Sequence, residues 1–233
     1  GMNVVITARG EAELTSLAKT LRERYGVRVE TVTLDLNDDN VLEKLAPVID
    51  NLDLGLLIYN TAFYDIREFL DCDIESHLRT LNVNCRSLLR VVHHVGGALC
   101  RRGRGGVIIM SSMSGWQGAS LLSTYAATKA FDTVLGEGLW AELRGRGVDV
   151  LSFVAGATKT PNFLSMTPES KQKEAFPMMP EEVAREALST LGRKPLQKAG
   201  PINKVAAFVL LRLLPRRWAV MFMSRANQNL YGG

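Results

Sequence analysis

The sequence predicts an α/β fold in which a doubly wound parallel sheet lies between two layers of helices. Short apolar runs alternate with helix-forming segments along most of the chain, an order that implies parallel strands joined by right-handed crossovers. The 233 residues are 46% hydrophobic and 22% charged, which suits one soluble domain with a sizeable core. Because no repeat or low-complexity linker divides it, we predict a single domain over 1–233, with a helical tail at 201–233.

Each element follows from its local pattern. The run V-I-I-M-S-S at 107–112, for example, is apolar up to its last two residues, as in a buried parallel strand. The predicted strands cover residues 3–8, 28–33, 54–59, 106–112 and 148–154. The predicted helices cover residues 10–25, 39–50, 73–100, 123–145 and 180–192. Ligands of such sheets bind beyond the carboxyl ends of the strands.

Tyr125 and Lys129 are the strongest candidates for chemistry. They lie four residues apart in S-T-Y-A-A-T-K-A-F, so they share one face of the predicted helix. Ser112 stands thirteen positions before Tyr125, at the carboxyl end of a predicted strand. A cation beside a phenol lowers its pKa from about 10, and such a group next to a hydroxyl suits proton transfer to a carbonyl oxygen. A tyrosine and a lysine at this spacing are by themselves common on helices; the Ser112 spacing favours the catalytic interpretation.

With these residues the chain resembles the short-chain dehydrogenase/reductase family. The matching motifs occur in the family's order, from about residue 3 to 161. The resemblance also rests on L-D-L at 34–36, L-I-Y-N-T-A at 57–62, T-L-N-V-N-C at 80–85 and V-A-G-A-T-K-T-P at 154–161. It departs from the family pattern at Tyr59, Ala62 and Ala155. The resemblance implies a Rossmann-like three-layer fold and transfer of a hydride between NAD(P)(H) and a carbonyl/alcohol pair.

The resemblance also implies roles for four residues. Tyr125 is the general acid/base, and Lys129 lowers its pKa and holds the nicotinamide ribose. Ser112 hydrogen-bonds the substrate oxygen. Asn84, with Asn82 as the alternative, orders a water in the proton relay.

Cofactor contacts follow in the same way. The resemblance places Asp35 at the adenine and Thr160 at the nicotinamide carboxamide, with Asn60 and Gly156 in neighbouring cofactor loops. Arg9 stands at the end of the first predicted strand, where an NAD enzyme usually carries a carboxylate. An arginine there suits a 2′-phosphate, so we expect NADP rather than NAD; the alternative is an ordinary solvated charge.

One part of the family pattern is not found. The opening G-M-N-V-V-I-T-A-R resembles the family's second strand, and no G-x-x-x-G-x-G turn precedes it. We therefore expect a sheet that lacks its first strand, and weak binding of a dinucleotide. The remaining strands should close the gap, or another segment or subunit should fill it. A homodimer is expected, because the family's two long helices form such an interface.

Two C-terminal segments leave alternatives open. Residues 157–179 lack clear periodicity, which predicts a lid over the site or a mobile surface loop. The tail is apolar on nearly all sides, but Arg212, Pro215, Arg216 and Arg217 interrupt it. It could pack over the substrate cleft or a subunit interface, lie on a membrane surface, or be disordered. Similar tails occur in family members that act on acyl chains or other lipophilic carbonyls, including steroid-like compounds.

The composition of the chain argues against several classes of function. The net charge of +4 is small, and the sequence has no stretch in which basic and aromatic residues alternate. We therefore do not expect nucleic-acid binding. Three cysteines without metal-ligand spacing indicate a reducing cytoplasm, and no metal site is expected. The rival to an NADP-dependent oxidoreductase is a cofactor-free, catalytically silent dimeric scaffold of the same fold.

Overall fold

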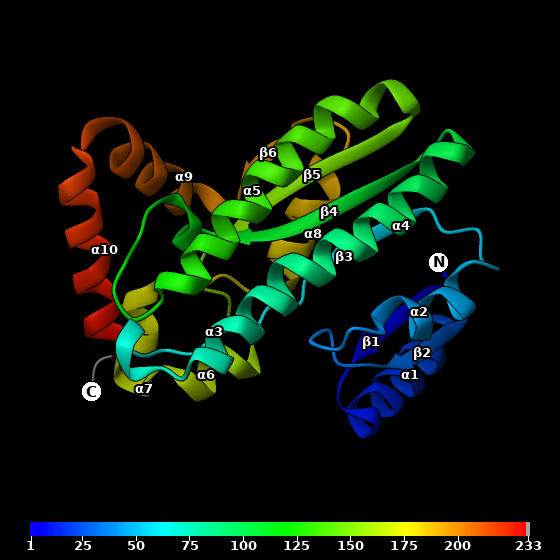
Figure 1. Ribbon diagram of the computed structural model, residues 1–233, viewed down its shortest axis with the longest axis horizontal. Helices are drawn as coiled ribbons and strands as arrows, with labels where there is room; N and C mark the ends of the chain where they lie inside the picture. The colour runs from blue at the N-terminus through cyan, green and yellow to red at the C-terminus, as the bar shows by residue number, and fades with distance from the viewer. Residues whose placement is uncertain (232–233) are drawn as a thin grey trace. The chain divides into compact units, whose positions relative to one another are not determined.

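The computed structural model describes residues 1–231, and its contacts divide the chain into two compact units (Figure 1). Unit 1 covers Gly1–Leu54 and unit 2 begins at Gly55. Parallel strands with flanking helices make up both, as predicted. The last two residues of the predicted tail lie outside the described residues.

Unit 1 contains two strands and two helices. They are β1 (Val4–Ala8), α1 (Glu11–Tyr25), β2 (Val29–Thr33) and α2 (Val41–Ile49). The strands pair in parallel, from Val4 opposite Val29 to Ala8 opposite Thr33. Helix α1 ends at Gly26, whose φ of 63° places it in the left-handed region that favours glycine. One side of each helix is buried against the strands, through residues that include Leu14, Ala18, Leu45 and Ile49.

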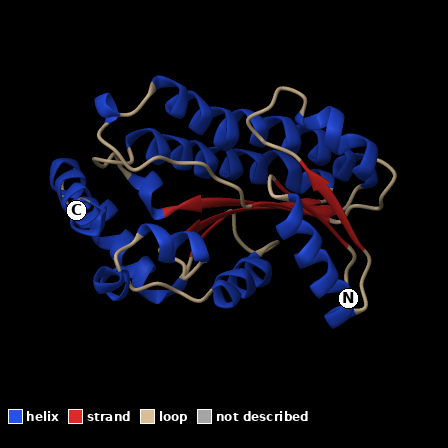
Figure 2. Cartoon of the chain, turned by 90° about the horizontal axis from the view of Figure 1, so that it is seen from below, coloured by secondary structure: helices blue, strands red, loops and turns tan. Residues whose placement is uncertain are grey.

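Unit 2 contains a four-stranded parallel sheet in the order β3-β4-β5-β6. The strands are β3 (Leu56–Tyr59), β4 (Gly105–Ser112), β5 (Val148–Ala155) and β6 (Leu196–Lys198). The longer helices are α3 (Ile74–Leu81), α4 (Ser87–Arg102), α5 (Ser123–Leu143), α8 (Pro180–Thr190), α9 (Gly200–Phe208) and α10 (Arg216–Tyr231). Figure 2 shows helices on both faces of the strands, and in Figure 1 α4 and α5 cover one face while α8 lies on the other.

The core of unit 2 explains why the sheet is so apolar. Ile108, Leu151 and Phe153 are buried, and Val183 and Ala187 of α8 pack against them. Strands covered by helices on both faces have no polar side, which is the pattern that the run at 107–112 predicted.

Several predicted elements differ from the observed ones. The predicted helix 73–100 is interrupted by a π-helical turn at Asn82–Arg86, between α3 and α4. Residues 157–179 are not one loop: they contain α6 (Pro161–Met166) and α7 (Glu169–Gln172), and a bridge joins Thr158 to Met178. Strand β6 was missed because three residues carry too little periodicity.

The expectation of a missing first strand and cofactor turn is not confirmed, and within the described residues no strand pairing joins the two sheets. In the described chain β1 and β2 form one sheet, and β3 belongs to the other. The expectation that the remaining strands close up is therefore wrong for strand pairing within this chain.

The tail forms α9, a π-helical turn at Val209–Leu213, and α10. Ala207, Leu210 and Ala219 are buried with Trp116 in a common cluster. The described part of the tail is therefore packed against the rest of unit 2, and its place over a substrate cleft or a subunit interface stays a prediction. Among residues 1–231, no helix combines the length and hydropathy needed to cross a bilayer.

Candidate active site

Ser112 is the last residue of β4, opposite Ala155 at the end of β5. Its Oγ accepts a hydrogen bond of 3.2 Å from the backbone N–H of Ser114, which leaves its O–H free to donate. Gly115 allows this segment to approach α5, because a Cβ there would lie 2.6 Å from the carbonyl carbon of Lys129. The turn after β4 is thereby held close to the helix that carries Tyr125.

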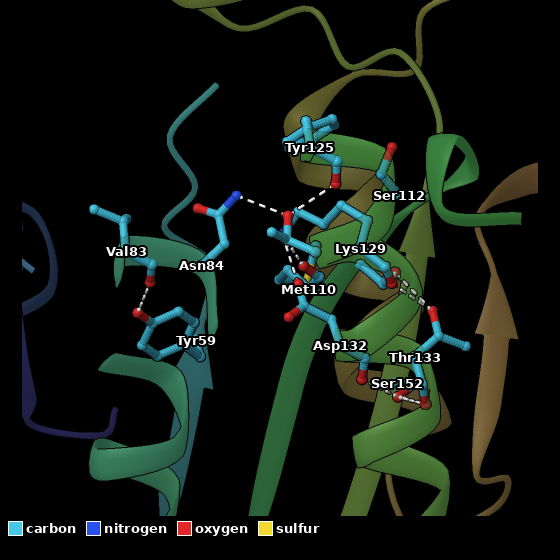
Figure 3. A network of polar contacts seen from close by, with 12 residues as sticks. Tyr59, Val83, Asn84, Met110, Ser112, Tyr125, Lys129, Asp132, Thr133 and Ser152 are labelled. Atoms are coloured by element: carbon cyan, nitrogen blue, oxygen red, sulfur yellow. Dashed lines mark hydrogen bonds and ion pairs between the residues drawn. The ribbon is translucent and has the colours of Figure 1, made fainter. Parts of the chain in front are cut away.

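Tyr125 lies in the first turns of α5, and its phenol is hydrogen-bonded to Ser112. The structure thus brings together the two residues whose spacing the sequence singled out (Figure 3). Burial raises the pKa of Tyr125 to about 12; the hydrogen bond with Ser112 opposes this rise, and the charge of Asp132 adds to it. The phenol is therefore protonated at neutral pH, poised to donate a proton.

Lys129 lies on the same helix, but its ammonium group is already engaged. Nζ donates to Oδ2 of Asp132 and to the carbonyl of Met110, each at 2.8 Å. The side chains of Lys129 and Asp132 are only 4% and 2% exposed. Nζ lies 5.8 Å from the centroid of the Tyr125 ring. The pKa of Tyr125 is raised rather than lowered in this structure, where Asp132 is paired with Lys129, and the expected lowering by Lys129 stays a prediction.

Asp132 is a charged group that the sequence analysis missed. Burial raises its pKa, while the charge and hydrogen bond of Lys129 oppose that rise. Its negative charge also contributes to the raised pKa values of Tyr59, Cys85 and Tyr125. Oδ1 is buried without a hydrogen-bond partner in the described chain. The signal was present in the sequence, since Asp132 follows Lys129 by three residues and so lies on the same helical face.

Asn84 lies in the π-helical turn, and its side chain is buried and fully bonded. Oδ1 accepts from the N–H of Phe63 at 2.7 Å, and Nδ2 donates to the carbonyl of Phe63 and to Oγ1 of Thr128, both at 2.9 Å. Thr128 in turn donates to the carbonyl of Tyr125 at 2.8 Å. Asn84 therefore links the segment after β3 to the backbone of α5. Single π turns of this kind occur frequently at functional sites.

The proposed cofactor residues divide between the units. In unit 1, Arg9 and Asp35 follow β1 and β2 at the same edge of the sheet, and Asp35 accepts from the N–H of Asn37 at 2.9 Å. In unit 2, Asn60 follows β3 and is exposed.

Gly156 follows β5 and permits a close approach, because a Cβ there would lie 2.4 Å from Nδ2 of Asn203 on α9. Thr160 caps α6, and its Oγ1 accepts from the N–H of Phe163 at 3.2 Å. Both residues therefore have structural tasks at the carboxyl end of the sheet.

Two further tyrosines approach Tyr125 from distant parts of the chain. The ring of Tyr64, which follows β3, lies 5.0 Å from that of Tyr125, centroid to centroid. Tyr231, at the end of α10, is close enough for its charge to affect Tyr64, and Tyr125 affects the pKa of Tyr231. Asn162 donates to the Tyr64 hydroxyl at 2.8 Å. No local pattern marks Tyr64 or Tyr231, so sequence reasoning could not have found them.

Helix α10 is held beside the site by hydrogen bonds. Asn227 donates to the carbonyl of Ser120 at 2.9 Å, and Ser224 accepts from the N–H of Ser120 at 3.0 Å. Arg216 donates to the carbonyl of Trp116 at 2.7 Å. The tail thus covers the segment that joins Ser112 to Tyr125.

Comparisons with known proteins bear on this geometry. Residues 1–171 match the family model described as short chain dehydrogenase. A 7beta-hydroxysteroid dehydrogenase of Collinsella aerofaciens is 35% identical over 207 residues, which cover 88% of this chain and 79% of that protein. A very-long-chain 3-oxoacyl-CoA reductase of Rattus norvegicus is 28% identical, over 99% of this chain and 74% of that protein.

Solved structures agree with these matches. A structure described under 7beta-hydroxysteroid dehydrogenase stereoselectivity aligns with a TM-score of 0.89 and 30% identity, over 95% of this chain and 87% of that one. A short-chain dehydrogenase from Sphingobium yanoikuyae in complex with NADPH aligns with a TM-score of 0.75 and 25% identity, over 98% and 86%.

Proposed function

Because the chain belongs to the short chain dehydrogenase family of NAD(P)-dependent oxidoreductases, we propose that it reduces a ketone on a lipophilic substrate with NADPH. The observation that carries this proposal is the hydrogen-bonded pair of Ser112 and Tyr125 at the carboxyl end of β4. A hydroxyl and a protonated phenol that point to one place can both donate to one carbonyl oxygen.

The proton chemistry favours the direction of reduction. Tyr125, with a pKa of about 12, keeps its proton at neutral pH and passes it to the oxygen as that oxygen becomes an alkoxide. Ser112 donates a second hydrogen bond to the same oxygen and stabilises its developing charge. The cofactor, when bound, supplies the hydride that reduces the carbonyl carbon.

Some of the residues proposed to bind NADP are suitably placed, and others are engaged elsewhere. Arg9 is exposed and lies at the strand edge of unit 1 beside the segment that carries Asp35, which suits a phosphorylated ribose. Lys129 does not present its ammonium group to a ribose, since Asp132 and Met110 hold it. NADP, with NAD as the alternative, is therefore proposed from Arg9, and the ribose role of Lys129 remains a prediction. Asn84 is proposed to support the relay by holding Thr128.

The proposed substrate class is steroid-like or acyl. Tyr64 and Tyr231 place aromatic surface beside Tyr125, and aromatic faces bind flat or extended apolar groups. The relatives named as hydroxysteroid dehydrogenases and as 3-oxoacyl-CoA reductases act on substrates of these two kinds.

The test is NADPH oxidation with a 7-ketosteroid and a 3-oxoacyl thioester as substrates. We expect Tyr125→Phe and Ser112→Ala to lower kcat, the former by about 10²–10⁴-fold because it removes a general acid. Tyr25→Phe, which changes an exposed tyrosine in α1, is the matched control. Activity retained by Tyr125→Phe would exclude this tyrosine as the proton donor.

The buried Lys129–Asp132 pair favours a second candidate, a catalytically silent scaffold that binds no cofactor. Calorimetry with NADPH distinguishes the two, because a scaffold shows no binding. For either candidate we propose a homodimer that forms through α4 and α5. Leu89 and Val134 are exposed on these helices, and light scattering tests the proposal.

All three cysteines are free thiols, which fits the cytoplasm as the proposed location.

A further inference from the structure

The outer side of the tail exposes an unusual amount of apolar surface. We call this the tail surface: exposed apolar side chains of α9, the π-helical turn and α10, chiefly Val205, Phe208, Leu211, Leu213, Trp218 and Phe222. Trp218 and Phe222 are 57% and 59% exposed, and Leu213 is 62% exposed. Large exposed apolar patches on folded proteins mark interaction sites.

This exposure does not come from a loosely attached segment. The inner side of the same helices is buried, through Ala207, Leu210 and Ala219. Arg216 and Asn227 also donate hydrogen bonds to the carbonyls of Trp116 and Ser120, in the segment between β4 and α5. The helices are thus held on one side while the tail surface stays exposed, and α9 and α10 lie at one edge of unit 2 (Figure 1).

Charge gives the tail surface its chemical character. Residues 200–233 contain no aspartate or glutamate. Arg212, Arg217 and Arg225 are exposed and form no ion pair within residues 1–231. Lys204 pairs with Glu186 at 2.9 Å, so these three arginines dominate the local charge. Apolar side chains therefore lie beside unneutralised positive charge.

We propose that the tail surface docks on an anionic lipid bilayer. Aromatic and aliphatic side chains beside arginines are typical of helices that lie in the interface of a membrane, where the chains enter the headgroup region and the cations meet anionic lipids. A second copy of this chain fits less well, because a twofold contact would bring together two copies of the same positively charged surface. This proposal is independent of the proposed reaction.

The test is sedimentation of the full chain with vesicles of phosphatidylcholine, alone or mixed with phosphatidylglycerol. We expect binding to the anionic vesicles to exceed binding to the neutral ones by about tenfold or more, and to weaken as salt rises. Trp218→Ser with Phe222→Ser should lower binding by about tenfold at unchanged surface charge. Arg212→Gln, Arg217→Gln and Arg225→Gln together should abolish the preference for anionic lipid.

Leu188→Ser, at an exposed position of α8, is the matched control and should bind as the original chain does. Circular dichroism and thermal unfolding show that each variant folds. Brominated lipid should quench the original chain more than Trp218→Phe, which places Trp218 in the bilayer. Absence of vesicle binding, or binding unchanged by both sets of substitutions, overturns the proposal. A dimer in solution that Trp218→Ser with Phe222→Ser converts to a monomer, without vesicle binding, assigns the tail surface to a second copy instead.

Discussion

Replacing Asp132 with asparagine should lower the pKa of Tyr125. In the structure Asp132 Oδ2 lies 2.8 Å from Lys129 Nζ and cancels the field of that cation at the phenol. This negative charge is one cause of the raised Tyr125 pKa. The substitution removes it and keeps a side chain of the same shape, so the ammonium group acts on Tyr125 without opposition.

The size of the effect follows from the distance. Nζ lies 5.8 Å from the Tyr125 ring centroid. At an effective dielectric constant of about 20, a cation at this distance stabilises a phenolate by about 3 kcal/mol. One pKa unit corresponds to about 1.4 kcal/mol, so the pKa of Tyr125 should fall from about 12 by roughly 2.

Absorbance of the phenolate, titrated with pH and compared with a matched Tyr125→Phe chain, measures this pKa without any substrate. The double variant Lys129→Met, Asp132→Asn should return the pKa close to its original value, since no cation remains. Glu174→Gln breaks the exposed i,i+3 pair with Lys171 and is the control that should change nothing. An unchanged or higher Tyr125 pKa in Asp132→Asn would refute the claim that Asp132 masks Lys129.

Three further outcomes are expected. Asn84→Ala leaves the buried backbone groups of Phe63 without their partners and should lower the free energy of unfolding in urea by about 1–3 kcal/mol. Gly115→Ala forces a Cβ against the backbone of α5 and should cost about 1–3 kcal/mol in the same assay, while Gly118→Ala, which meets nothing within 4 Å, should cost less. Burial alone would raise the pKa of Glu186, but hydrogen bonds, chiefly from Lys204, hold it below its ordinary value. This carboxylate therefore stabilises the fold above its unfolded pKa, and the stability advantage over Glu186→Gln should vanish as the pH falls through the lowered pKa in acid unfolding experiments.

Local sequence patterns were sufficient for the order of strands and helices. The apolar run at 107–112 and the segment around Tyr125 each point to one element, because burial on both faces of a parallel sheet leaves little choice of side chain. Ser112 and Tyr125 could be paired in advance, since a strand end and the helix that follows it lie at the same edge of the sheet.

Local sequence patterns did not predict the side-chain contacts of Lys129 and Asn84. Lys129 could be placed on the correct helix, but its contact with Asp132 depends on burial. The electrostatic attraction between two charges is much stronger in a buried site than in water. The bonds of the Asn84 amide to the backbone of Phe63 were not predicted, and its expected role in ordering a water stays a prediction.

By itself the sequence determined the α/β class, the longer strands and helices up to residue 192, and the Ser112–Tyr125 pair, because each depends on residues close in the chain or on one edge of a sheet. Only the tertiary structure decided that Asp132 neutralises Lys129 and that Tyr64 and Tyr231 approach Tyr125. The tyrosine contacts join segments that are far apart in the chain, so packing rather than local preference selects them. The Lys129–Asp132 pair is local in the sequence, but its strength comes from burial, which only the tertiary structure supplies.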